Sequence, residues 1–336
     1  MPKKTLLYAA ALALVLGTAG GAQAAEKISI MVGGIEKIIY LPAKLAEQLG
    51  YFKEQGLDVE LLSEPAGVSA EDEMLAGAVQ AVVGFYDHSI DLQAKGKFVE
   101  SVVQFSQAPG EVELVSAKMA DQIKSPADFK GKNLGVTGLG SSTNFLTQYL
   151  AVKNGVPLGQ FTSIPVGAGN TFIAAMQQGK IDAGMTTEPT ISRLLKTGEA
   201  KILVDLRSVE TTRAALGGVY PAACLYMQAD WVEQHHDEVQ KLANAFVKTL
   251  HYIATHSAEE IAAQMPRDYY AGDKDLYVHA LATGKQMFTN DGVMPSDGPP
   301  TVLQVLGTFD KTVKGKSIDL TKTYTSSFVN AVPATN

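Results

Sequence analysis

The sequence has 336 residues, with 28 Lys and Arg against 35 Asp and Glu, which is enough length for two domains with cores of their own. An acidic chain without basic runs argues against nucleic acid as a partner. The single cysteine, Cys224, excludes an intrachain disulfide and a cysteine-rich metal site.

The first 24 residues have the pattern of a cleavable export signal. Lys3 and Lys4 precede the apolar run Leu6–Leu16, which is too short to span a bilayer comfortably. Residues 22–24 read Ala-Gln-Ala, a small-x-small cleavage sequence, so we expect cleavage after Ala24 and an exported, soluble mature protein. The signal carries two of the 28 basic residues and no acidic residue, which leaves 26 basic against 35 acidic residues and a net charge of −9.

Apolar runs and helical spacings alternate along the first part of the mature chain. Helices are expected at 41–52 and 69–76, the second opened by a capping box of Ser69 and Asp72. Strands are expected at 28–32, 57–62, 78–85, 98–105 and 112–117. The order β-α-β-α-β predicts a parallel sheet with crossover helices.

A similar unit follows residue 118. Its expected strands are 133–137, 162–166, 181–185 and 202–206, with helices at 126–129, 144–154, 170–179 and 191–198. A strand at 222–227 is expected to return to the first domain. The rest of the chain is predicted to be helical, with a capping box of Ser257 and Glu260, and with a loop or edge strand from Ile318.

The most suggestive stretch is Gly138-Leu-Gly-Ser-Ser-Thr143, between a buried strand and a helix. The first turn of a helix has unpaired N–H groups and a partial positive charge, so this loop is suited to an anionic or polar ligand group. It lacks the Gly-Lys-Ser/Thr end of a Walker loop, and Thr143 stands where a dinucleotide fingerprint needs Gly or Ala. A plain N-cap by Ser141 or Ser142 is the alternative.

Ligands of parallel sheets bind beyond the carboxyl ends of the strands, and several loops here occupy such ends. They are Gly33-Gly34, Tyr86 to Ser89, Gly138 to Thr143 and Thr186 to Glu188. Asp87, His88 and Ser89 cannot form a catalytic triad because they are adjacent, and the histidines lack metal-ligand spacing. We therefore expect no catalytic residue, no metal and no cofactor.

The remaining candidates each have two interpretations. Glu188 either accepts a hydrogen bond from a ligand or caps the following helix. Tyr40, Tyr86 and Tyr220 could sandwich a ligand ring, or pack in the core. Arg193, Arg207 and Arg213 could pair with a ligand anion, but surface exposure is the favoured interpretation for each.

Four segments carry a resemblance to a known family. They are Ser125–Val136, Gly140–Thr143, Gln178–Ala183 with Glu188-Pro189, and Leu45–Val59. Together they resemble the substrate-binding proteins of nitrate, sulfonate and taurine ABC importers, a superfamily that includes pyrimidine-precursor proteins. One departure is Gln80, where the family usually has Asp. The related thiamine-pyrimidine synthases use a cysteine cluster that this sequence lacks.

The resemblance implies an α/β fold of the periplasmic binding protein type II, with two β-α-β-α-β lobes around a ligand cleft and two hinge strands. The first lobe would comprise residues 25–113 and 222–336, and the second residues 114–221. The expected partners are a small-molecule ligand and an inner-membrane permease with its cytoplasmic ATPase. The protein itself is expected to be a monomer in the periplasm.

The leading functional hypothesis is a solute-binding component of an ABC importer that captures a small organic anion, a sulfonate or a carboxylate. The expected ligand-binding residues are Gly33, Gly34, Tyr40, Tyr86, Asp87, His88, Gly140, Ser141, Ser142, Thr143, Thr187, Glu188 and Tyr220. In this hypothesis the Ser141–Thr143 loop holds the anion. The alternative is a pyrimidine or thiamine-precursor binding protein, or a synthase-like enzyme on the same fold. A sensor subunit is a third possibility.

Overall fold

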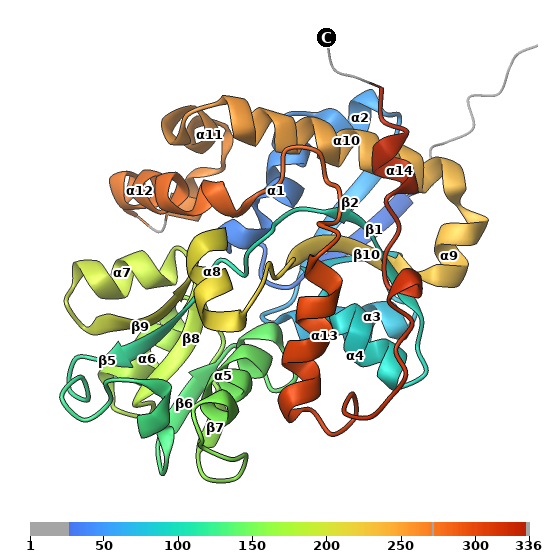
Figure 1. Cartoon of the computed structure of the whole chain (residues 1–336). Coiled ribbons are helices and arrows are strands. Elements are labelled where there is room, and N and C mark those ends of the chain that lie inside the picture. The colour runs from blue at the N-terminus through green and yellow to red at the C-terminus, as the bar shows by residue number, and fades with distance from the viewer. Residues whose placement is uncertain (1–26, 271, 334–336) are drawn as a thin grey trace, which may run out of the picture.

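The computed structural model describes residues 27–270 and 272–333, so the expected signal peptide and its cleavage site lie outside the described residues. Two five-stranded sheets dominate this part of the chain (Figure 1). The mixed α/β architecture with two separate sheets confirms the expected fold class. No helix among the described residues combines the length and apolarity needed to cross a membrane.

The first sheet has the strand order β2-β1-β3-β10-β4. Its strands are β1 Lys27–Val32, β2 Asp58–Ser63, β3 Ala81–Phe85, β4 Val99–Gln104 and β10 Ala223–Gln228. β1 runs parallel to β2 and β3, whereas β10 is antiparallel to both β3 and β4. The expected return of a later strand to this sheet is therefore confirmed.

The second sheet has the order β7-β6-β8-β5-β9. Its strands are β5 Glu111–Ser116, β6 Asn133–Val136, β7 Thr162–Pro165, β8 Ala183–Thr187 and β9 Ala200–Leu206. β6 is parallel to β7 and β8, and β5 is antiparallel to β8 and β9. Like β10, β5 enters from the other sheet, which explains why it runs against its neighbours.

Helices surround both sheets. Those of the first half are α1 Leu41–Gln48, α2 Tyr51–Glu54, α3 Gly67–Leu75, α4 Asp87–Ala94, α5 Ser142–Lys153, α6 Asn170–Gln177, α7 Thr190–Lys196 and α8 Val209–Leu216. Those after β10 are α9 Ala229–Gln234, α10 His236–Thr255, α11 Ala258–Gln264, α12 Lys274–Gly284, α13 Gly298–Phe309 and α14 Ser327–Asn330.

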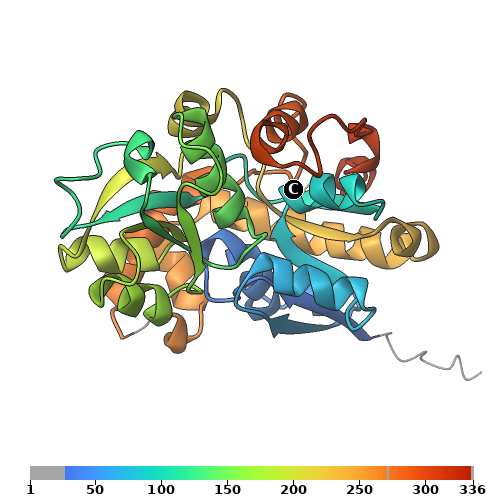
Figure 2. The same ribbon diagram turned by 90° about the horizontal axis from the view of Figure 1, so that it is seen from below.

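Short 3₁₀ helices complete the elements. They are Ile38–Tyr40, Pro126–Phe129, Arg267–Tyr270, Lys285–Met287 and Leu320–Lys322. Figure 2 shows the two sheets with their helices side by side, with β5 to β9 in green and yellow-green beside the blue N-terminal strands. From the C-terminal part, α12 packs against α7 and α13 packs against α5, so these helices join the two halves.

Two short connections link the sheets, one between β4 and β5 and one between α8 and β10. Ser106 ties them together, because its backbone oxygen accepts from the Ala222 N–H at 3.2 Å and its Oγ accepts from the Ala223 N–H at 2.9 Å. The expected boundary between residues 113 and 114 falls inside β5, whereas the change of sheet lies at residues 105–110. The lobe division stays a proposal, and these connections are its natural hinge.

Local expectations have mixed outcomes. The capping box of Ser257 and Glu260 is confirmed at the start of α11. The expected box at Ser69 is wrong, because α3 begins two residues earlier, at Gly67, with Ala66 at its N-cap.

Gln80, the departure from the family pattern, has a structural role. Its Oε1 accepts from the Ser29 N–H at 2.8 Å and so ties β1 to the turn before β3.

Candidate functional site

A small cavity lies between the two sheets, where loops at the strand ends of both meet. The free space inside it is about 10 Å³, room for about one water molecule, so its walls lie close together in this form. Its lining residues are Lys37, Ile39, Tyr40, Gly67, Phe85, His88, Glu111, Thr137, Ser141, Ser142, Thr143 and Thr187. Both halves of the chain therefore contribute to one chamber.

The serine-threonine loop forms one side of this cavity. Thr137, Ser141 and Thr143 bring their hydroxyls together in a triangle with oxygen distances of 2.8–3.1 Å. Ser141 Oγ also donates to the Gly138 oxygen at 2.7 Å, and Thr143 Oγ1 accepts from the Thr137 N–H at 3.0 Å. Ser141 occupies the N-cap position of α5, although its side chain caps no N–H there. These hydroxyls are thus largely satisfied within the loop.

The next hydroxyl in the loop crosses to the first sheet. Ser142 Oγ donates to Asp87 Oδ2 at 2.6 Å, and the Tyr220 hydroxyl donates to the same oxygen at 2.9 Å. All three side chains are buried. Burial raises the pKa of the Asp87 carboxyl above its usual range, while His88 and the two hydroxyls act in the opposite direction. Asp87 therefore joins α4, the start of α5 and the segment before β10.

His88 borders the cavity and is almost fully buried. Its Nδ1 lies 3.3 Å from the Tyr226 hydroxyl and 3.2 Å from Glu71 Oε2, while Nε2 has no hydrogen-bond partner among the described residues. Burial raises the pKa of Glu71 to about 7, opposed by the neighbouring imidazole. Gly67 is required here, because a Cβ on it would lie only 2.9 Å from His88 Cε1.

Two buried glutamates lie on β5, and one of them reaches the cavity. Glu111 borders the chamber, and Glu113 lies two residues further along the same face of the strand. Glu113 Oε2 accepts from the Thr147 hydroxyl at 2.8 Å, whereas Glu111 Oε2 and Glu113 Oε1 have no partner in the described chain. Burial raises the pKa of Glu111 well above its usual range, and that of Glu113 to about 8.

Lys37 is the basic side chain nearest to these acids, but it is bound elsewhere. Its ammonium donates to the Gly33 oxygen at 2.5 Å and to the Pro65 oxygen at 3.1 Å. Burial lowers the pKa of Lys37 to about 8, with Glu111 opposing that shift. Lys37 thus ties the loop after β1 to the segment before α3.

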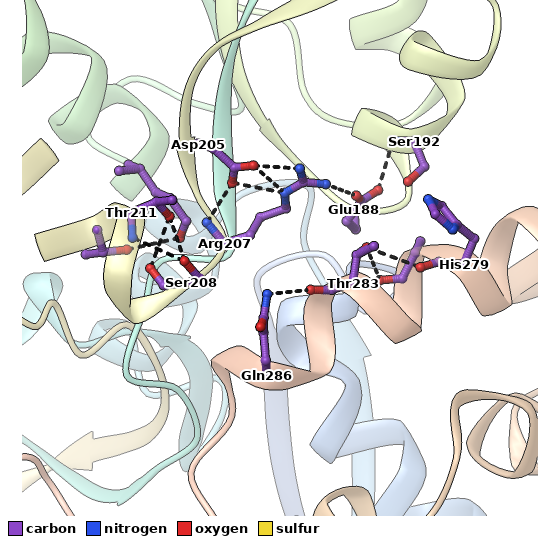
Figure 3. Close-up of polar contacts among 12 residues, drawn as sticks. Glu188, Ser192, Asp205, Arg207, Ser208, Thr211, His279, Thr283 and Gln286 are labelled. Atoms are coloured by element: carbon purple, nitrogen blue, oxygen red, sulfur yellow. Dashed lines mark hydrogen bonds and ion pairs between the residues drawn. The ribbon is translucent and has the colours of Figure 1, made fainter. Parts of the chain in front are cut away.

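Glu188 is held by the protein on both of its oxygens (Figure 3). Oε2 accepts from the Ser192 N–H at 2.9 Å in the first turn of α7, and Oε1 accepts from Arg207 Nη1 at 3.0 Å. Arg207 lies between Glu188 and Asp205, and its Nε and Nη2 donate to the Asp205 carboxylate. The expected surface exposure of Arg207 is wrong, since only 15% of its side chain is exposed. The helix-cap interpretation of Glu188 fits this geometry.

The expected ligand-binding residues fall into two groups. Those that line the cavity are Tyr40, His88, Ser141, Ser142, Thr143 and Thr187. Those that do not line it are Gly33, Gly34, Tyr86, Asp87, Gly140, Glu188 and Tyr220. Gly34 and Glu188 instead border a wider open groove on the other side of Lys37.

Some residues outside the cavity have clear structural roles. The Tyr86 hydroxyl lies 2.5 Å from Thr323 Oγ1 in the C-terminal segment, so its ring points away from the cavity. Gly33 permits a close approach of backbones, because a Cβ there would lie 2.8 Å from Gly67 Cα. The expected loop at 86–89 is wrong in form, since Asp87 already begins α4.

The sequence analysis missed Lys37, Glu111 and Thr137 as cavity residues. Lys37 follows the glycine pair closely, which could have singled it out. Glu111 gave no such signal, because it alternates with apolar residues as in any half-exposed strand.

Comparison with known protein families matches residues 40–260 to the family described as NMT1/THI5 like. The chain belongs to this family. A solved protein from Bordetella bronchiseptica RB50 is 36% identical, with a TM-score of 0.86 over 90% of this chain and 96% of that one. The alkanesulfonate-binding protein SsuA from Xanthomonas axonopodis pv. citri, bound to MOPS, has 16% identity and a TM-score of 0.70, covering 90% and 98% of the two chains.

A curated relative has an enzyme's name. One 4-amino-5-hydroxymethyl-2-methylpyrimidine phosphate synthase of Saccharomyces cerevisiae is 26% identical over 239 residues, which cover 68% of this chain and 67% of the enzyme. The resemblance to the sulfonate-binding proteins and their pyrimidine-precursor relatives, expected from four sequence segments, is confirmed by these matches. The binding-protein neighbour below 25% identity establishes the fold alone.

Proposed function

We propose that the chain is the periplasmic solute-binding component of an ABC importer. The observation that carries this proposal is the cavity itself, a small polar chamber between two sheets that are joined by two short connections. Such an arrangement encloses a solute by hinge closure and exposes both halves to a membrane partner. The fold shared with an alkanesulfonate-binding protein supports the same role.

Contacts that cross between the halves define the closed form in this proposal. The Ile38 N–H donates to the backbone oxygen of Glu188 at 3.1 Å, and the Ser142 hydroxyl donates to the Asp87 carboxylate. At the rim, Lys196 pairs with Asp273 at 2.5 Å and Arg213 pairs with Asp297 at 3.1 Å. Opening at the Ser106 hinge would break these contacts together, so ligand binding and closure would be linked.

The proposal is tested by recovering the natural cargo. The full chain would be expressed with its N-terminal segment, purified from the periplasm, and unfolded, and the released small molecules would be identified by mass spectrometry. After refolding, the recovered compound should raise the melting temperature and reduce the radius of gyration in small-angle X-ray scattering. Absence of the protein from the periplasm, or a radius unchanged by the recovered compound, would contradict the proposal.

The second candidate, an enzyme of pyrimidine chemistry, rests on the similarity to the yeast synthase. Cys224 does not line the cavity. It is buried in β10, and burial raises the pKa of its thiol well above the usual range. A reactive thiol at the site is therefore not supported. Long incubation of the protein with the recovered compound, followed by mass spectrometry, would separate the two functions, because only an enzyme would convert the compound.

A further inference from the structure

Several polar atoms around the cavity have no partner in the protein. They are Asp87 Oδ1, His88 Nε2, Glu111 Oε2 and Thr187 Oγ1, and their residues are at most 2% exposed. Glu111, His88 and Thr187 border the chamber directly, and Asp87 Oδ1 lies 3.9 Å from His88 Nε2. A buried polar atom without a hydrogen bond is costly, so each of these atoms needs a partner that the chain does not supply.

The protein offers these acids little positive charge. Lys37 borders the chamber, but two of its three N–H donors bind backbone oxygens, and it forms no ion pair with Glu111 within the described chain. Arg207 is occupied by Asp205 and Glu188, away from the chamber. An ionised carboxylate only accepts hydrogen bonds, so the missing partners of Glu111 and Asp87 are donors.

The serine-threonine side does not reverse this balance. Its hydroxyls are committed to one another, to the Gly138 oxygen and to Asp87, which leaves no free hydroxyl for an oxyanion. An anion placed in the chamber would also face the unpartnered oxygen of Glu111, which it cannot satisfy unless that carboxyl keeps a proton to donate.

We infer that the cavity binds a small organic cation with several N–H donors, such as an amidinium, a guanidinium or a primary ammonium group. Glu111 holds its charge, and Thr187 and His88, which also border the chamber, complete its hydrogen bonds. The inference rests on the proposed function, because it assigns the cargo of the same cavity. It replaces the organic anion expected from the Ser141–Thr143 loop.

The pH dependence of binding follows from the burial of Glu111. The charged or titratable groups around it are Glu113 on the same strand, Asp87 and His88 on α4, Lys37 before the Ile38–Tyr40 helix, and the hydroxyls of Tyr40 and Tyr220. Burial holds the pKa of Glu111 high, so a cation must displace its proton and binds more tightly as the pH rises. An anion held by a protonated Glu111 would show the opposite dependence.

The test uses the smallest organic probes of each charge, because the chamber has room for about one water molecule and must widen to admit them. Acetamidinium and methylguanidinium are compared with acetate and methanesulfonate by isothermal titration calorimetry on the stripped, refolded protein at pH 6, 7 and 8. We expect binding of at least one cation, tightening with pH, and none of either anion. Glu111→Gln keeps the shape of the side chain and should weaken cation binding by at least tenfold. Glu100→Gln, on β4 away from the cavity, is the matched control.

Each outcome decides the inference. Binding of acetate or methanesulfonate without the cations would overturn it while leaving the solute-binding function intact. Binding of neither class would also overturn it, and the cargo recovered from the periplasm would then decide the proposed function separately. If Glu111→Gln fails to fold, the preference for cations and its pH dependence in the unmodified protein still decide the question.

Discussion

The two sides of the cavity differ in how far they satisfy themselves. On the loop before α5, the Thr137, Ser141 and Thr143 hydroxyls bond one another and nearby backbone groups. On the acidic side, Glu111 at the cavity and Asp87 next to it each keep an oxygen without a partner in the described chain, although both are buried. The loop that looks most like a ligand site in the sequence is thus closed on itself, and the side that looks ordinary is the one left incomplete.

This contrast teaches that polar composition alone does not identify a binding surface. Hydroxyls can both donate and accept, so neighbouring Ser and Thr residues readily complete one another. Carboxylates only accept, and two of them cannot satisfy each other when both are ionised. Incomplete hydrogen bonding, which needs coordinates to detect, is therefore the better guide to the ligand.

The largest expected effect tests the acidic side through Glu113. Its pKa is raised to about 8 by burial, from the ordinary 4.5, so the folded state keeps a proton that the unfolded chain releases. Stability from this group is present at low pH and is lost as the pH rises from about 4.5 to 8. Glu113 alone should therefore lower the free energy of unfolding measured in urea by about 4 kcal/mol between pH 5 and 9. Glu113→Gln should remove this part of the pH dependence and leave the part due to the other buried carboxyls with raised pKa, which are Glu71, Asp87 and Glu111.

The control for Glu113 is Glu233→Gln, at an exposed position on α9, which should leave the pH dependence of the wild type unchanged. A Glu113→Gln variant whose stability falls with pH as steeply as that of the wild type would show that other groups cause the dependence. The acidic side would then be less strained than its geometry indicates.

The next effect tests whether the loop side is complete in itself. Thr143→Val keeps the shape of the side chain but removes the acceptor of the Thr137 N–H and one corner of the hydroxyl triangle. We expect a loss of about 1–3 kcal/mol in the free energy of unfolding, measured by urea denaturation. Thr255→Val, at an exposed position near the end of α10, should change stability by less than about 0.5 kcal/mol. Equal effects at the two positions would contradict a self-satisfied loop.

A third prediction concerns the contact at which the two sides meet. Ser142→Ala and Tyr220→Phe each remove one hydrogen bond to Asp87 Oδ2, and each should cost about 1–2 kcal/mol. Because both donors serve one oxygen, the double variant should depart from additivity in a double-mutant cycle. Strict additivity would mean that Asp87 does not couple the two halves.

The smallest effect is expected at the rim. Arg213 and Asp297 pair across the halves, but their side chains are 52% and 57% exposed. Arg213→Gln should therefore cost less than about 1 kcal/mol, and the difference should vanish in high salt because exposed pairs are screened. A larger loss of stability in thermal unfolding that does not depend on salt would contradict this prediction. It would mean that the rim contacts, and not the cavity residues, supply most of the free energy that holds the two halves together.

Much of the fold could be predicted from the sequence. Alternating apolar runs and helical spacings gave the two sheets and the returning strand β10, because periodicity and glycine punctuation are local properties. The antiparallel course of β5 and β10 could not be predicted that way, because it depends on how the chain crosses between sheets. The expected capping box at Ser69 and the expected loop at 86–89 were wrong because α3 and α4 begin earlier, at Gly67 and at Asp87.

The site was less predictable for a related reason. Six of the expected residues line the cavity, since strand ends of such sheets converge. Glu111 escaped notice because the Glu-Val-Glu-Leu-Val alternation predicts one exposed face, whereas every residue of β5 is buried between helices and neighbouring strands. The pairing of Glu188 with Arg207 could not be predicted either, because the two residues are separated in sequence and come into contact only in the folded chain.

The position of β10 has a consequence for how the molecule folds. This strand separates β3 from β4 in the finished sheet, yet it is made only after all five strands of the other sheet. Until β10 is made, β3 and β4 each lack a neighbouring strand on one edge. Residues 111–206, in contrast, have all their sheet partners within one continuous segment. Contacts so distant in sequence form slowly, so we expect β5 to β9 to fold first and the N-terminal sheet to close last around β10.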